Sequence, residues 1–135
     1  MPRLAHDSPA AGEVAPGQGL AVAAEALYLV NLLLLPGVGF LVLLALYLRN
    51  LRVAPPLAVC HLRQTLSASL WAGALLLVAN VMILLLGGYH SPYTWMVAII
   101  YFTTCHATLV LLGVMGLAKA MAGQCFRFPL VGRPV

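Results

Sequence analysis

Charged side chains are scarce in this chain: its 135 residues include seven basic and three acidic ones, 7% in total. Soluble domains carry about 25% charged residues, whereas 63% of this sequence is hydrophobic. Too little polar surface remains to dissolve a globular domain, so the composition indicates an integral membrane protein. The net charge of +4 does not indicate nucleic-acid binding, because six of the seven basic residues flank apolar segments. We therefore expect the protein to contact the lipid bilayer and not to bind nucleic acid.

Acidic side chains are the scarcest charged group, and the sequence puts all three, Asp7, Glu13 and Glu25, outside the membrane interior. The acidic residues needed for paired-carboxylate catalysis or for a Ser-His-Asp triad are therefore missing from the interior. A glycine-rich phosphate loop after a strand is also excluded, because no strand is expected. The sequence thus favours a protein that is not an enzyme.

Cysteine is sparse as well, with three residues and no C-x-x-C pair or disulfide framework. Cys60 and Cys105 each precede a histidine. Adjacent residues on a helix point about 100° apart, so such a pair seldom holds one metal ion by itself. We expect buried thiols in Cys60, Cys105 and Cys125, and neither a metal nor a cofactor.

Three long apolar segments predict an all-α fold with three transmembrane helices. At 1.5 Å per residue each segment is long enough to cross a hydrocarbon core of about 30 Å. The expected helices cover about residues 21–48, 57–86 and 93–121. The expected division of the chain is a flexible tail at 1–20, a membrane domain at 21–123 and a cytoplasmic tail at 124–135.

Prolines mark the irregular points of these helices. Pro36 lies near the middle of the first segment, in "LPGVG", where it removes one hydrogen bond and frees the carbonyl of Leu32. This predicts a kink within a continuous helix. In the loop "GGYHSP", Ser91 and Pro92 are expected to begin the third helix.

The basic residues predict the orientation. They gather around the start of the second helix and around the end of the third helix, at Arg49, Arg52, Arg63, Lys119, Arg127 and Arg133. By the positive-inside rule this loop and the C-terminus face the cytoplasm, and the N-terminus and residues 87–92 lie outside.

Four polar residues are expected at similar depth within the membrane: Asn31, Asn80, Thr103 and Thr104. One interpretation is a layer of hydrogen bonds between helices, worth about 0.6 kcal/mol per bond. The alternative is a polar lining for a small substrate.

His106 is the one ionisable side chain expected near the middle of the membrane, which makes it a candidate functional residue. Counting along antiparallel helices puts it opposite Pro36, Gly37 and Gly73. Its N–H could then satisfy the freed carbonyl of Leu32. Ligation of a cofactor or proton transfer is the alternative.

The segment "VCHLRQT" begins the second helix with an unusual concentration of polar side chains. His61 and Gln64 are three residues apart and so share one helix face. The antiparallel register puts this face beside Lys119 and the start of the C-terminal tail. We expect His61, Arg63 and Gln64 to hold the tail against the basic loop.

Two separated motifs resemble a bacterial family of small three-helix membrane proteins, which is related to the twenty-kilodalton channel component of the chloroplast inner-envelope translocon. "HLRQTLSASL" (61–70) resembles H-x-[KR]-Q-A-x-[NS], and "GLAKAMAGQCFRFPLVGR" (116–133) resembles A-x-K-A-x-x-G-x-x-[YF]-R-[YF]-P-L. The sequence departs from these motifs at Thr65, Gln124 and Cys125. The matching positions are His61, Arg63, Gln64, Lys119, Gly123, Arg127 and Pro129.

This resemblance implies a multi-pass protein of the bacterial inner membrane. We expect an accessory or assembly subunit of a larger membrane complex, with a respiratory or uptake-hydrogenase complex as a host suggested by analogy. One alternative is a transport or translocation component that acts as an oligomer. Another is a haem-carrying subunit that uses His106 together with a partner chain.

Overall fold

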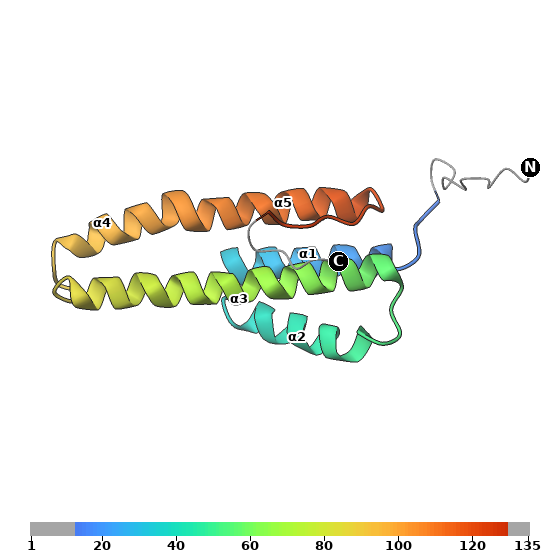
Figure 1. The fold of residues 1–135 in the computed structure, drawn as a ribbon, viewed down its shortest axis with the longest axis horizontal. Coiled ribbons are helices and arrows are strands. Elements are labelled where there is room, and N and C mark those ends of the chain that lie inside the picture. The colour runs from blue at the N-terminus through green and yellow to red at the C-terminus, as the bar shows by residue number, and fades with distance from the viewer. Residues whose placement is uncertain (1–12, 130–135) are drawn as a thin grey trace, which may run out of the picture.

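A computed structural model describes residues 13–129 and confirms the all-α fold (Figure 1). The termini at 1–12 and 130–135, which hold most of the predicted N-terminal tail and half of the predicted C-terminal tail, lie outside the described residues. A π-helical turn, η1, joins the last two helices into one continuous run. The elements are α1 (Gln18–Leu33), α2 (Val38–Asn50), α3 (Pro56–Leu85), α4 (Tyr93–Ile100), η1 (Tyr101–His106) and α5 (Ala107–Met121).

Two helices are long and apolar enough to cross a membrane. They are α3, with 30 residues, and the continuous run Tyr93–Met121, with 29 residues. They lie antiparallel and are joined by a short loop (Figure 1). Within this loop Gly87 and Gly88 have positive φ, and the backbone N–H of Tyr93 donates to the hydroxyl of Ser91 at 3.3 Å.

The predicted single helix over residues 21–48 is wrong. The chain reverses at residues 34–37, so that α1 and α2 form an antiparallel hairpin (Figure 1). Gly37 has φ +88°, a conformation that ends a helix rather than bending it. The side-chain oxygen of Asn31 then accepts hydrogen bonds from the N–H groups of Gly37 and Phe40, at 2.9 and 3.0 Å. These bonds satisfy donors at the start of α2 that have no partner within the helix.

Neither arm of this hairpin is long enough to span a bilayer. The arms have 16 and 13 residues, or roughly 24 and 20 Å at 1.5 Å per residue, against a core of about 30 Å. The arms also approach closely, since a Cβ on Gly39 would lie 2.8 Å from the Cβ of Asn31. The hairpin is therefore a compact unit packed against the two long helices.

The start of α1 lies at the same end of the molecule as the basic loop and the end of α5. A Cβ on Gly17 would lie 3.0 Å from Pro55, and the amide of Gln18 donates to the carbonyl of Met121 at 2.6 Å. We call this the basic end. The expected location of the N-terminus, on the opposite side of the membrane from the C-terminus, depended on a crossing by residues 21–48 and therefore loses its basis.

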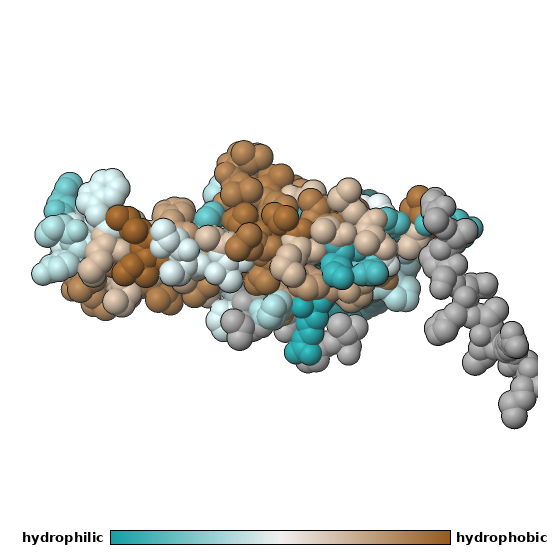
Figure 2. Space-filling model, turned by 90° about the horizontal axis from the view of Figure 1, so that it is seen from above, coloured by the Kyte–Doolittle hydropathy of each residue, from teal (hydrophilic) through white to brown (hydrophobic). Residues whose placement is uncertain are grey.

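The core lies around α1. One buried cluster joins Ala24, Leu43 and Leu62, and a second joins Tyr28, Ala68 and Phe128. Small residues of α5 let α1 approach, because a Cβ on Gly113 would lie 2.7 Å from the Tyr28 ring. At the opposite end α3 and α4 extend beyond the hairpin (Figure 1). In Figure 2 hydrophobic side chains cover much of the middle of the visible surface, and hydrophilic residues gather at the tip of this end.

Candidate functional site

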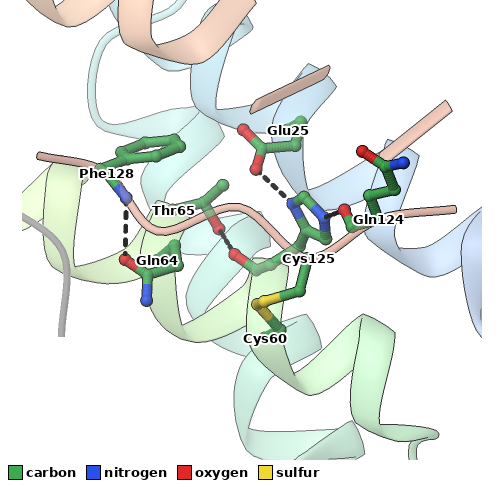
Figure 3. Close-up of a disulfide and its surroundings, with 8 residues drawn as sticks. Glu25, Cys60, Gln64, Thr65, Gln124, Cys125 and Phe128 are labelled. Carbon is green, nitrogen blue, oxygen red and sulfur yellow. Dashed lines mark hydrogen bonds and ion pairs between the residues drawn. A yellow bond between two sulfur atoms is a disulfide. The ribbon is translucent and has the colours of Figure 1, made fainter. Parts of the chain in front are cut away.

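A buried polar cluster at the basic end joins α1, α3 and the segment after α5. His61 Nδ1 lies 2.6 Å from Glu25 Oε1, and His61 Nε2 lies 2.9 Å from the carbonyl of Gln124 (Figure 3). Both Glu25 and His61 are fully buried. A carbonyl only accepts, so Nε2 carries a proton. A second proton is shared between Nδ1 and the carboxyl group, which makes this a coupled pair.

The sequence put Glu25 outside the membrane interior, but it did not predict that the carboxyl group is buried in the protein against His61. The packing explains its burial, because a Cβ on Gly116 would lie 2.5 Å from Glu25 Oε2. Only a glycine there leaves room for the carboxyl group. Burial raises the pKa of Glu25, and the hydrogen bond from His61 opposes that shift. An acid among Ala and Leu residues of an apolar helix, with no charged neighbour, was the signal that sequence reasoning missed.

A disulfide joins Cys60 of α3 to Cys125 of the tail, with the two Cα atoms 6.0 Å apart (Figure 3). The sequence predicted no disulfide and buried thiols at Cys60 and Cys125, and that prediction is wrong. The two cysteines adjoin His61 and Gln124, whose contact brings them together. Cys105 is a free thiol, as expected, but it is partly exposed rather than buried.

A second contact fixes the tail further along α3. The backbone N–H of Phe128 donates to the side-chain oxygen of Gln64 at 3.4 Å, and the Phe128 ring packs 5.7 Å from that of Tyr28. The Tyr28 hydroxyl donates to the carbonyl of Leu109 at 3.0 Å. The tail therefore crosses a surface made by α1, α3 and α5.

The seven residues of the predicted docking set fall into three groups. His61 and Gln64 are buried and bond to the tail directly. Lys119 donates to the side chain of Gln124 at 3.1 Å, and Gly123 has φ +68° where the tail leaves α5. The remaining three, Arg63, Arg127 and Pro129, are exposed.

The four residues of the predicted polar layer do not bond to one another in the described part of the chain. Asn31 bonds to the start of α2, and Asn80 accepts from the Tyr89 hydroxyl at 2.6 Å. Thr103 and Thr104 donate to carbonyls of their own helix. The predicted layer of hydrogen bonds between these four residues is therefore wrong, because each side chain bonds instead within its own helix, its hairpin or the adjoining loop.

His106 lies where the counting along antiparallel helices put it. It lines a cavity together with Pro36, Gly37 and Gly73. The expected hydrogen bond from its ring to the carbonyl of Leu32 does not occur among the hydrogen bonds of the described residues. His106 instead packs against the Phe102 ring, with ring centroids 5.2 Å apart.

Comparison with known proteins found no match among protein-family models, curated proteins or solved structures. The fold and site define a class only: a small all-α protein with two helices of membrane-spanning length, a packed helical hairpin and a sealed polar cluster. The resemblance of the two motifs to the three-helix membrane family stays a prediction.

Proposed function

We propose that this protein is a non-enzymatic small subunit of the inner membrane that docks onto a larger membrane complex through its basic end. The observation that carries this proposal is a group of exposed cations with no carboxylate of residues 13–129 within ion-pair distance. Such a group fits an acidic partner surface or lipid phosphates. Its members are Arg49, Arg52, Arg63, Lys119 and Arg127.

The sealed cluster beneath these cations supports docking rather than chemistry. Glu25 and His61 are 0% exposed and Gln64 is 1% exposed, so no substrate reaches them. Their bonds hold the tail, which carries Arg127, against α3. A surface that is ordered before binding loses less conformational entropy when a partner docks.

The two alternative functions are a haem-carrying subunit and a transport component. A haem on His61 would require breaking one of its two ring contacts, to Glu25 or to Gln124, because the iron binds a single ring nitrogen. A haem held by His106 and a partner chain would give the purified complex a Soret absorption band. A transport component would instead act as an oligomer, and flux into proteoliposomes would detect it.

We propose that the basic end faces the cytoplasm, because the described part of the other end carries no Lys or Arg. Disulfides persist in oxidising compartments and are rare in the cytosol. In this orientation Cys60 and Cys125 would form a reducible pair. The host complex, respiratory or of the uptake-hydrogenase type, follows from the resemblance and analogy alone.

The test is purification in mild detergent of C-terminally tagged protein at native expression. We expect a stoichiometric membrane complex with the wild type and with the control His90→Glu, which changes charge at the far end. The double variant Arg63→Gln/Arg127→Gln should lose the partner while its own fold persists. A homogeneous homo-oligomer with no partner would refute docking and favour transport.

A further inference from the structure

A cavity of about 520 Å³ lies between the turn of the hairpin, the middle of α3 and the π-helical turn. It is partly open to the surroundings. Pro36 and Gly37 form one wall, Ser69 and Gly73 a second, and Tyr101, Phe102 and His106 a third. The volume lies within the range of about 300–1,000 Å³ that is typical of small-molecule sites. None of the tail contacts described above involves these walls.

Ser69 lines this cavity and carries a hydroxyl group that makes no hydrogen bond. The residue is only 4% exposed, yet its hydroxyl oxygen has no hydrogen-bond partner in the described structure. Thr65, one turn earlier, shows the usual arrangement, since its hydroxyl donates to the carbonyl of His61 at 2.8 Å. A buried polar group without a partner destabilises a fold by about 1–3 kcal/mol. A ligand that accepts from Ser69 would remove that cost.

The depth of Ser69 restricts what this ligand is. Ser69 follows the first residue of α3 by 13 positions in a helix of 30 residues, or roughly 20 Å along an axis of about 45 Å. At this mid-helix depth a phospholipid offers methylene groups, because its ester carbonyls lie near the interface. Methylene groups cannot accept a hydrogen bond. The occupant must carry an acceptor into the apolar middle of the membrane.

The wall opposite α3 favours a flat ring. It is formed by η1, a helix type that is frequent at functional sites. The Tyr101 and Phe102 rings lie 5.3 Å apart, and the His106 ring lies 5.2 Å from that of Phe102. The facing position, Gly73, would meet no atom within 4 Å if it carried a Cβ. Aromatic rings stack favourably in such an arrangement.

We propose that this cavity binds a lipid-soluble planar compound that carries a ring carbonyl, of the quinone class. The hydroxyl of Ser69 donates to the carbonyl oxygen. The ring lies against the aromatic wall, and the apolar tail extends through the open side into lipid. This binding site is independent of docking at the basic end, and either can fail without the other.

Binding is tested on the full-length protein in nanodiscs of saturated phosphatidylcholine. The probe is 1,4-benzoquinone with a decyl tail, and its uptake is measured above that of empty discs. Decylbenzene, which has a similar ring and tail but no carbonyl, is the control ligand. The variants are Ser69→Ala, Gly73→Leu and the control Thr103→Ala, whose hydroxyl bonds to its own helix outside the cavity.

We expect saturable binding of about one quinone per chain in the wild type and in Thr103→Ala. Ser69→Ala should weaken binding about tenfold, as expected for the loss of one hydrogen bond in an apolar site. Gly73→Leu should abolish binding, while its unfolding temperature shows that it remains folded. Equal binding of both ligands with no effect of Ser69→Ala would overturn the proposal and indicate an acyl-chain site. The absence of saturable quinone binding would overturn it too.

Discussion

Removing either partner of the Glu25–His61 pair should destabilise the protein strongly. Both side chains are fully buried, and Glu25 Oε2 already has no hydrogen-bond partner in the described structure. His61→Ala would leave the carboxyl group without its one donor and would also free the carbonyl of Gln124. Breaking a buried pair in this way costs about 3–5 kcal/mol. We expect that loss for His61→Ala and a similar one for Glu25→Ala.

The double variant Glu25→Ala/His61→Ala distinguishes a coupled pair from two independent residues. If the cost arises from the abandoned partner, the second substitution adds little. The double variant should then be destabilised no more than the worse single variant, a coupling of about 3 kcal/mol. Glu25→Gln is the conservative control, because its amide oxygen can still accept from His61. We expect it to cost about 1–2 kcal/mol.

The assay is denaturant titration of the detergent-solubilised protein, followed by helical circular dichroism. Protease sensitivity of the C-terminal tail is the second readout, because His61 holds the backbone of Gln124. Single variants should expose the tail before global unfolding. Free-energy losses that simply add in the double variant, with the tail equally protected throughout, would refute the coupled pair.

Three further predictions concern a close contact, a hydrogen-bond acceptor and the disulfide. Gly116→Ala should lower the unfolding free energy by about 1–3 kcal/mol, because the added methyl group overpacks against Glu25. Gly73→Ala has open space around it and should change the unfolding free energy by less than about 0.5 kcal/mol; thermal unfolding of both variants checks this. Asn31→Ala should cost about 1–2 kcal/mol, because two N–H groups at the start of α2 lose their acceptor. Asn80 is less buried than Asn31, so Asn80→Ala should cost less in the same titration. Reduction of the disulfide, which closes a loop of 65 residues, should lower the unfolding free energy by about 4 kcal/mol and release the tail to protease; an unchanged digest would contradict this.

The helices themselves were predictable from the sequence, because long apolar runs bounded by proline and glycine leave few alternatives. The reversal at residues 34–37 was not. "LPGVG" is compatible with both a kink and a turn, and tertiary contacts decide between them. Here the choice depends on α1 packing on α3 and α5, which the position of Gly113 opposite Tyr28 allows. Helical periodicity alone carries no information about that contact.

The tail contacts of His61 and Gln64 followed from their three-residue spacing and from the antiparallel register of the last two helices. Glu25 was missed because an acid near the start of an apolar segment usually lies at the interface. The disulfide was missed because Cys60 and Cys125 are far apart in sequence, and pairing at that distance cannot be read without the register. In both cases the sequence did not show which residue of the neighbouring segment lies opposite, His61 for Glu25 and Cys125 for Cys60.

The central claim is that the first apolar segment folds back as a hairpin and does not cross the membrane. Reporters fused separately to the N-terminus and to the C-terminus, with a third inserted in the 87–92 loop, test it most directly. We predict that both terminal reporters lie on the same side of the membrane and the loop reporter on the other. Terminal reporters on opposite sides would show that residues 21–48 cross the bilayer as one helix and would contradict the hairpin.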